Sequence, residues 1–157
     1  MANNKTVSVW LEIEDGKNKG KIALQKRSAK NKTWKFLCQA TWAGKVEENE
    51  DLDEAAEREC REELGNSFCA SIDFPNLEMS YKGEFVMKNE DWSSYNYFSK
   101  IKEKSLKRIK MHKEALPDIL FVGKDDEFYS LNSGKDPKTN IVLFDDQYKI
   151  LKKLLKK

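Results

Sequence analysis

Apolar and polar side chains alternate along the first part of the chain. Residues 6–14 (TVSVWLEIE) carry an apolar side chain at alternate positions, which predicts a half-buried strand. Turn-forming residues around Gly16 and Gly20 follow, and residues 21–27 (KIALQKR) are typical of a second strand. Residues 34–42 (WKFLCQATW) alternate less regularly, but their β-forming composition predicts a third strand.

The spacing of apolar residues then changes to that of a helix. Residues 51–64 repeat a small or apolar side chain every four positions from Ala56 to Leu64, which predicts a helix with one apolar side. Gly65 follows and is suited to the left-handed backbone that often ends a helix. A second, amphipathic helix is predicted over residues 145–156.

Shorter patterns fill the rest of the chain. Residues 77–87 and 92–101 are two more strand candidates, separated by the turn-like sequence KNED. Residues 118–122 (DILFV) predict a short buried strand, and residues 125–131 (DDEFYSL) predict a helical turn, while the lysine-rich residues 100–113 fit neither class. Strands on both sides of a central helix, with another helix at the end, predict an α/β fold in which helices cover the faces of a mixed sheet.

The composition limits the number of domains and the class of partner. A chain of 157 residues fits one domain over residues 1–157, and its 39% hydrophobic content supports a buried core although 36% of the residues are charged. The net charge of +2 indicates no general affinity for nucleic acid, and no apolar run is long enough to span a membrane. We therefore expect no membrane partner.

The cysteines Cys38, Cys60 and Cys69 do not follow the spacing of a metal site. The first ten residues also lack the charged-then-apolar layout of a signal peptide. Reduced and mostly buried thiols in a cytoplasmic protein are therefore the expectation.

Three glutamates gather on one side of the predicted helix. At about 100° per residue, Glu59, Glu62 and Glu63 share an arc of roughly 100°. Like charges at this spacing repel by roughly 0.2–0.5 kcal/mol per pair, so the helix gains no stability from them. A divalent cation removes the repulsion, because Mg2+ and Mn2+ prefer hard oxygen ligands.

The segment that contains these glutamates, GKVEENEDLDEAAERECREELG, resembles the Nudix box G-x5-E-x7-R-E-U-x-E-E-x-G-U, in which U is a bulky apolar residue. Two positions depart from the family pattern: Asn66 replaces the last apolar residue, and Ala43 stands where many members carry a second glycine. Neither departure removes a carboxylate, so we expect only small effects on the loop or its packing. The positions at the spacing of the box are Gly44, Glu50, Arg58, Glu59, Cys60, Glu62, Glu63 and Gly65.

The resemblance implies a Nudix-type α/β/α sandwich and hydrolysis of a pyrophosphate linkage in a small-molecule substrate, a nucleoside diphosphate joined to another moiety. In this family water attacks phosphorus, and divalent ions such as Mg2+ or Mn2+ bridge the pyrophosphate. By resemblance, the metal ligands are Glu59, Glu62, Glu63 and the carbonyl of Gly44. Either Glu62 or Glu59 also polarises the attacking water.

Arg58 is expected to orient the site. Its guanidinium fork can pair with a carboxylate of the box, Glu50 being the first candidate, and so hold the loop against the helix. Glu47 belongs to the same loop and lies near the expected metal.

Basic and aromatic residues before the box are candidates for binding the substrate. Lys26 and Arg27 end the second predicted strand, where family members often carry a basic residue that faces the phosphates; the alternative is an edge-strand charge that discourages aggregation. Trp34 and Trp42 have faces on which a base can stack, and the alternative for both is packing in the core.

A further carboxylate is expected late in the chain, because several Nudix enzymes place a base or an extra metal ligand in the loop before the late strand. Glu114 and Asp118 occupy that region, and Glu114 is the first candidate for an additional catalytic residue. His112, the single histidine, is interpreted as an exposed side chain without a role. The lysines of residues 100–113 are interpreted as a solvated face, so nucleic acid is not the expected partner.

Two other functions stay open. The segment before the box is similar in layout to the branch that includes isopentenyl-diphosphate isomerases, although Lys45 stands where that branch often has a histidine. The other alternative is a catalytically silent module that binds a nucleotide, although binding alone does not require all three carboxylates. Self-association is also open, because homodimers are common among Nudix domains.

Overall fold

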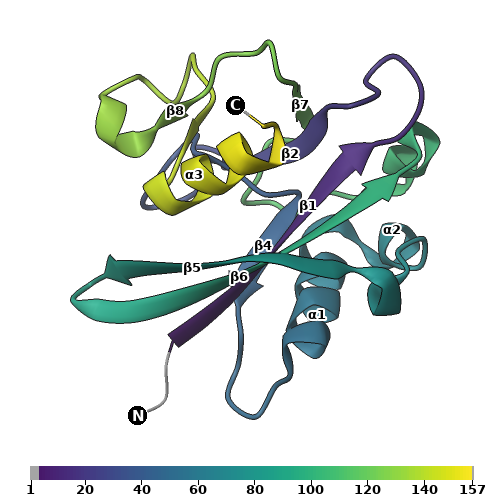
Figure 1. The fold of residues 1–157 in the computed structure, drawn as a ribbon, viewed down its shortest axis with the longest axis horizontal. Coiled ribbons are helices and arrows are strands. Elements are labelled where there is room, and N and C mark those ends of the chain that lie inside the picture. Colours follow the sequence, from purple (N-terminus) through teal and green to yellow (C-terminus); the bar gives the residue numbers. More distant parts are fainter. Residues whose placement is uncertain (1–3, 157) are drawn as a thin grey trace.

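The computed structural model describes residues 4–156, which form one nine-stranded mixed sheet flanked by helices (Figure 1). None of the helices within this range combines the length and the apolar character needed to cross a membrane. The strands are β1 (Asn4–Ile13), β2 (Ile22–Lys26), β3 (Cys38–Gln39), β4 (Trp42–Lys45), β5 (Glu78–Met87), β6 (Glu90–Ile101), β7 (Leu120–Val122), β8 (Tyr129–Ser130) and β9 (Val142–Leu143). The helices are α1 (Leu52–Leu64), α2 (Asn66–Cys69) and α3 (Asp145–Leu154), with short 3-10 helices at Phe74–Asn76, Glu103–Arg108 and Leu131–Ser133.

Strand β1 is the centre of the sheet. Along one edge it pairs in parallel with β6 over its whole length, and β6 pairs antiparallel with β5. Along the other edge it pairs antiparallel with β4 near its start and with β2 near its end. Strands β3, β9 and β8 extend the sheet beyond β2, and β7 also pairs with β2. The prediction of a mixed sheet is confirmed.

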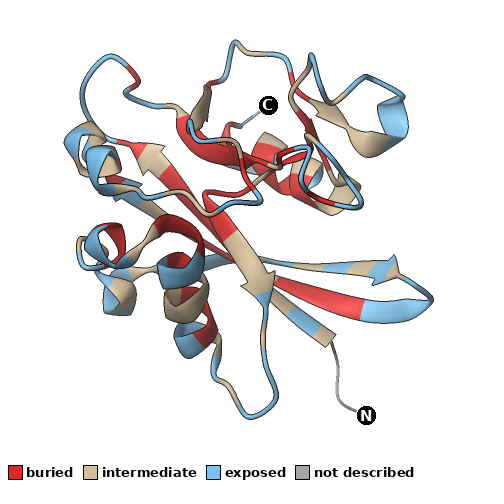
Figure 2. Ribbon diagram, turned by 180° about the vertical axis from the view of Figure 1, so that it is seen from behind, coloured by how far each residue is buried: buried red, intermediate tan, exposed pale blue. Residues whose placement is uncertain are grey.

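Helices cover both faces of this sheet. Val7 and Val9 of β1 pack into the cluster under α1, whereas Trp10 points to the opposite face, into the cluster that contains Ile150 of α3. The strand predicted over residues 6–14 is confirmed, but the expectation that it is half-buried is wrong, because a helix covers each face. Figure 2 shows the buried part of the sheet between the helices, and the exposed tip of the β5–β6 hairpin beyond them. The predicted α/β/α layering is confirmed.

Thr41 forms hydrogen bonds at the point along β1 where its pairing partner changes from β4 to β2. Oγ1 of Thr41 accepts a hydrogen bond from the N–H of Leu11 at 3.0 Å and donates one to the carbonyl of Ala23 at 2.6 Å. Gln147 of α3 adds a second link, since its Nε2 donates to Oγ of Ser8 at 2.9 Å. These buried contacts fix the position of the chain between β3 and β4. Strand β4 lies beside α1 and contains Gly44, the first residue of the box.

A distant loop holds the end of α1. The N–H groups of Lys110 and His112 donate to the carbonyls of Leu64 and Glu63 at 2.9 and 3.0 Å, so the last turn of the helix has partners for these groups. Gly65 follows with φ 89 and ψ 158, a positive φ but not the left-handed helical conformation that we expected. A Cβ on Gly65 would lie 3.2 Å from the Cβ of Lys110, so the glycine also lets this loop approach.

Two of the secondary-structure predictions are wrong. Residues 34–42 do not form one strand: a loop in which Trp34 and Phe36 have φ values of 55 and 65 leads into the short strands β3 and β4. Residues 125–131 do not form a helical turn, because β8 pairs with β9 in this segment. In both places pairing with distant strands replaces the conformation that local composition favours.

The three cysteines are free and buried, as expected. Burial raises the pKa of the Cys38 thiol to about 11, and burial also raises the pKa of Cys60 far above its usual value. Both thiols are therefore protonated near neutral pH, which makes them poor nucleophiles.

Candidate functional site

A cavity of about 1090 Å³ opens over the sheet, bordered by α1, α3, β4 and β5. The box lines one wall through Gly44, Glu59, Glu62 and Glu63. The β5 strand and the side chains of α3 line other walls, together with loop residues far apart in the sequence. The volume is that of a typical small-molecule site, large enough for a nucleotide.

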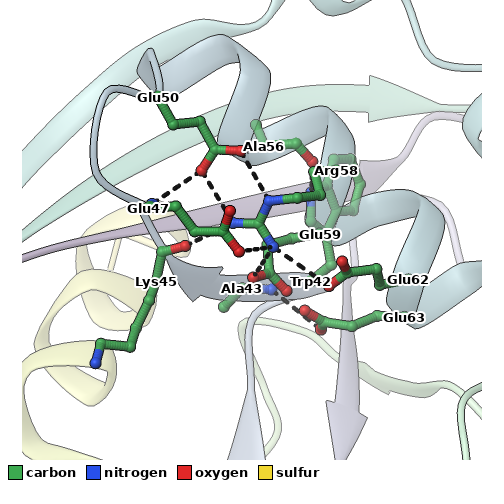
Figure 3. Close-up of polar contacts among 10 residues, drawn as sticks. All are labelled: Trp42, Ala43, Lys45, Glu47, Glu50, Ala56, Arg58, Glu59, Glu62 and Glu63. Carbon is green, nitrogen blue, oxygen red and sulfur yellow. Dashed lines mark hydrogen bonds and ion pairs between the residues drawn. The ribbon is translucent and has the colours of Figure 1, made fainter.

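Arg58 is the centre of the polar contacts in the box (Figure 3). Its Nε and Nη2 donate to the two oxygens of Glu50 at 2.8 and 3.0 Å, and Nη2 also donates to the carbonyl of Lys45 at 2.8 Å. Its Nη1 donates to Glu59 at 2.8 Å and to Glu62 at 3.3 Å. The paired guanidinium lowers the pKa of Glu50. The pairing of Arg58 with Glu50 predicted from the sequence is confirmed, and it joins the loop after β4 to α1.

The carboxylate of Glu59 lies so close to Gly44 that residue 44 has no room for a side chain. A Cβ on Gly44 would overlap with the carboxylate of Glu59. The glycine therefore lets this carboxylate lie directly against the backbone of β4, while Arg58 contacts it at 2.8 Å.

Glu63 is the buried carboxyl group of the site. Its Oε1 accepts hydrogen bonds from Nε2 of Gln25 at 2.6 Å and from the N–H of Ala43 at 3.3 Å. Burial, together with the hydrogen bond and the charge of Glu59, raises the pKa of Glu63 well above its usual range. The charge of Glu59 beside this buried carboxyl group is a repulsion that a bound divalent cation would remove.

Gln25 connects Glu63 to His112. The amide nitrogen of Gln25 donates to Glu63 and, at 3.1 Å, to the carbonyl of Thr41, so Oε1 of Gln25 is the atom that faces Nε2 of His112 at 2.9 Å. An amide oxygen only accepts, which requires that Nε2 of His112 carries a hydrogen. Burial lowers the pKa of His112, which favours the neutral ring.

The carboxylates of the box do not form a ready-made metal site. Within residues 4–156, no group of three or more His, Cys, Asp or Glu side chains is arranged to hold a metal ion. The side chain of Glu62 is 58% exposed, and both Glu62 and Glu47 contact Arg58, the latter at 3.7 Å. The donor chemistry nevertheless fits Mg2+ or Mn2+, because the carboxylate oxygens of Glu59, Glu62 and Glu63 line the same cavity from one helix.

Two of the four predicted substrate residues are placed elsewhere by the structure. Trp42 is fully buried and its Nε1 donates to the carbonyl of Ala56 at 2.8 Å, so the ring packs under α1 and does not line the cavity. Lys26 is 8% exposed, and its Nζ donates to the carbonyl of Asn140 at 3.4 Å, also away from the cavity. Neither side chain lies where it could meet a ligand in the cavity, because core packing holds Trp42 and the backbone carbonyl of Asn140, distant in sequence, holds Lys26.

The other two, Arg27 and Trp34, line the cavity. Nη2 of Arg27 donates to Asn31 at 2.7 Å, whereas its buried Nε has no hydrogen-bond partner within residues 4–156. An unpaired buried guanidinium N–H suits an anionic oxygen. Trp34 is 46% exposed, and its ring contacts Phe144 edge to face with 5.2 Å between the ring centroids. Substrate contact by these residues stays a prediction.

The loop of residues 110–116 brings a carboxylate to the site. Glu114 lines the cavity and Asp118 does not, which agrees with the choice of Glu114 as the first candidate. The backbone carbonyl of Glu114 accepts hydrogen bonds from the N–H of Ser28 at 2.8 Å and from Nδ2 of Asn31 at 2.6 Å, so the loop is tied to the end of β2. His112 also lines the cavity and is only half exposed, so the expectation of an exposed histidine is wrong.

Gln25, Phe144 and Asp146 are among the residues of the site that were not predicted from the sequence. Gln25 had a signal, because a polar residue inside an apolar strand must find buried partners. Phe144 and Asp146 come from the start of α3 and had none, since only the tertiary fold places them at the cavity. Burial raises the pKa of Asp146.

Known proteins share both the sequence pattern and the fold. The family model for the NUDIX domain matches residues 3–126. An uncharacterized Nudix hydrolase from Listeria innocua is 29% identical over 107 residues, which cover 68% of this chain and 58% of that protein. The chain thus spans little more than half the length of this relative.

Solved structures resemble the fold of the chain. They include a MutT/nudix family protein from Enterococcus faecalis, with a TM-score of 0.63 and 16% identity, covering 97% of this chain and 61% of that one. A bifunctional NMN adenylyltransferase/ADP ribose pyrophosphatase from Francisella tularensis has a TM-score of 0.60 and 20% identity, covering 99% of this chain and 42% of that one. At such identities the likeness concerns the fold alone.

Proposed function

The chain belongs to the NUDIX family, and from that premise we propose that it is a metal-dependent hydrolase of a pyrophosphate linkage in a nucleoside diphosphate joined to another moiety. The observation that carries this proposal is the cavity wall formed by Gly44, Glu59, Glu62 and Glu63 of the box. Carboxylates that face a nucleotide-sized cavity are suited to phosphoryl chemistry when a divalent ion is bound.

The proposed ligands of Mg2+ or Mn2+ are Glu59, Glu62, Glu63 and the carbonyl of Gly44. When bound, the ion supplies positive charge to the pyrophosphate oxygens. Glu63 contributes a carboxyl group already held by Gln25. Glu62 reaches the other ligands by turning away from Arg58, its present partner at 3.3 Å. Arg58 keeps Glu50 and Glu59 as partners during this change, so it goes on orienting the site.

Other residues of the cavity are suited to binding the substrate. The unpaired Nε of Arg27 donates to a phosphate oxygen, and Trp34 with Phe144 offers aromatic surface for a base. Glu114, Glu62 or Glu59 orients the attacking water by accepting a hydrogen bond from it. The Francisella tularensis protein of similar fold is described in complex with AMP and an Mn ion, the classes of ligand proposed here.

The proposal treats residues 1–157 as one Nudix domain. Helix α3 lies beyond the residues matched by the family model, yet Asp146 and Lys153 of this helix line the same cavity as the box. Because α3 forms one wall of the cavity, we include this helix in the proposed domain.

Substitution of the ligands tests the chemistry. We expect Glu62→Gln and Glu63→Gln to lower kcat by about tenfold to a hundredfold or more, because an amide is a weaker ligand than a carboxylate. Glu54→Gln is the matched control, since Glu54 is exposed on the same helix and does not line the cavity. Wild-type rates in both ligand variants would contradict the assignment.

The substrate is identified by a screen of nucleoside triphosphates, dinucleoside polyphosphates, nucleotide sugars and nucleotide cofactors with Mg2+ or Mn2+. The mass of each product shows which phosphorus is attacked. A panel in which the wild-type protein binds nucleotides but releases neither phosphate nor pyrophosphate would favour the silent binding module instead.

A further inference from the structure

Strand β5 is an unprotected edge of the sheet. It pairs with β6 on one side, and no strand within residues 4–156 pairs with its other side. The strand has 10 residues, well above the usual length, and no proline interrupts it. Figure 1 shows the β5–β6 hairpin reaching past the helices. Such an edge presents a row of unpaired N–H and C=O groups to any strand that can lie beside it.

The sequence of this edge is complementary to itself. In an antiparallel pair of two β5 strands centred on Gly83, residues at equal distances before and after the glycine face each other. Lys82 of one strand then faces Glu84 of the other, and Tyr81 faces Phe85. Opposite charges and aromatic pairs at facing positions are the cross-strand contacts that stabilise a sheet. Because the arrangement is two-fold, each of these pairs occurs twice.

The two charged side chains of this pattern are exposed. Those of Lys82 and Glu84 are 54% and 66% exposed and form an ion pair of 3.7 Å within the strand. Two of the three large hydrophobic residues that are exposed within residues 4–156 also lie on β5: Met79 is 49% exposed and Val86 is 69% exposed. Exposed apolar side chains on an open strand edge are typical of a contact surface.

We propose that β5 binds β5 of a second copy of this chain, antiparallel and centred on Gly83, so that one sheet continues through a two-fold homodimer. We choose a second copy of this chain as the partner because of charge. In an antiparallel pair, the sequence Lys-Gly-Glu places each lysine opposite a glutamate of the other strand. The register of β5 shifts between Met79 and Tyr81, so the regular pairing is centred on Tyr81–Phe85. Residues from Tyr81 to Met87 also line the cavity, which places the second copy along the rim of the site.

Charge reversal tests the pairing and its register. Sedimentation equilibrium of the wild-type protein is expected to give twice the mass of one chain at high concentration, with dissociation on dilution. Lys82→Glu puts two pairs of carboxylates face to face, and Glu84→Lys does the same with two pairs of lysines. Each single variant is expected to raise the dimer dissociation constant by at least about tenfold, because like charges directly opposite each other destabilise a sheet.

The two single variants also provide the decisive control. When they are mixed, the two carboxylates of one chain face the two lysines of the other, so a heterodimer is expected to form by native mass spectrometry. The double variant Lys82→Glu with Glu84→Lys restores the pairing and is expected to recover the wild-type dissociation constant within about threefold. Lys19→Glu, an equal charge change in an exposed turn, leaves it unchanged. A monomeric wild-type protein, or single variants that dimerise as well as the wild type, would overturn the proposal.

Discussion

At the scale of single residues, a glycine and a glutamine place the carboxylates of the box. Gly44 allows Glu59 to lie on the backbone of β4, and Gln25 holds Glu63 at 2.6 Å. Gly44 permits the contact because it has no side chain. Gln25 makes its contact with a side chain whose amide donors and carbonyl acceptor all have hydrogen-bond partners. The same glutamine reaches His112, so the buried carboxyl group is linked to the loop that carries Glu114.

Gly44→Ala is expected to lower kcat by at least about tenfold while leaving the fold intact. The new Cβ overlaps with the end of a flexible side chain, so Glu59 escapes by rotating away and loses its place in the site. Because this rotation relieves the overlap, the free energy of unfolding should change by less than about 1 kcal/mol. Steady-state kinetics and urea denaturation measure the two effects separately.

Ala43→Gly is the matched control for this substitution. It changes the neighbouring residue by one methyl group and keeps the N–H that donates to Glu63 at 3.3 Å. Wild-type activity in the control with a reduced rate in Gly44→Ala supports the close approach of Glu59. If Gly44→Ala had the wild-type rate, the position of Glu59 against the backbone of β4 would not be needed for activity.

At the scale of elements, an ion pair joins the loop after β4 to α1. Arg58 binds both oxygens of Glu50 and also the carbonyl of Lys45, so the loop is attached at two points. A bidentate pair of this kind fixes both distance and orientation. The residues of the pair are eight positions apart, which is why spacing within the box was sufficient to predict the contact.

The stability contributed by this ion pair should depend on pH. Arg58 lowers the pKa of Glu50 below its ordinary value of 4.5, so the folded state binds the proton of Glu50 more weakly than the unfolded state. The contribution is therefore complete above the unfolded pKa and is lost as the pH falls through the folded pKa. Glu50→Gln should lower the free energy of unfolding by about 1 kcal/mol at neutral pH, and this difference should shrink on acidification.

Urea denaturation between about pH 3 and pH 7 measures that difference. Glu48→Gln is the control, because Glu48 is an exposed carboxylate of the same loop. A difference between wild type and Glu50→Gln that stays constant across this range would contradict the ionic origin of the attachment.

The elements themselves were predicted with uneven success, for physical reasons. In the long strand β1 and the helices α1 and α3, apolar residues recur with the period of the element that forms, so the sequence predicted these elements correctly. Residues 34–42 have the composition of a strand but contain Trp34 with a positive φ, a conformation that composition does not reveal. The two tryptophans at the ends of this segment therefore have opposite fates: Trp34 is at the cavity, and Trp42 is in the core.

At the scale of the whole molecule, the site is assembled from elements that are distant in sequence. The box could be predicted because its residues lie within 22 consecutive positions, from Gly44 of β4 to Gly65 at the end of α1. Phe144 and Asp146 could not, since their place at the cavity depends on how α3 packs on the sheet next to β5. A local pattern thus predicts the carboxylate wall of the cavity, whereas the wall formed by α3 requires the tertiary structure.

Metal binding should stabilise the whole fold, because the proposed ligands connect β4 to α1. A ligand that binds only the native state adds about 2.7 kcal/mol to the free energy of unfolding at a hundredfold excess over its Kd. We therefore expect Mg2+ or Mn2+ to raise the Tm of the wild-type protein in a concentration-dependent manner. Chelation with EDTA should reverse the rise, as followed by thermal unfolding.

Glu63→Gln separates this effect from a purely structural role. In the absence of metal the substituted amide can still accept from Gln25 and Ala43 and can donate to Glu59, so the Tm should stay within a few degrees of the wild type. The rise with Mg2+ or Mn2+ should be largely lost, whereas Glu54→Gln should retain it. If Glu63→Gln responded to metal like the wild type, the buried carboxyl group would not be a ligand, and its role would be limited to its hydrogen bonds with Gln25 and Ala43.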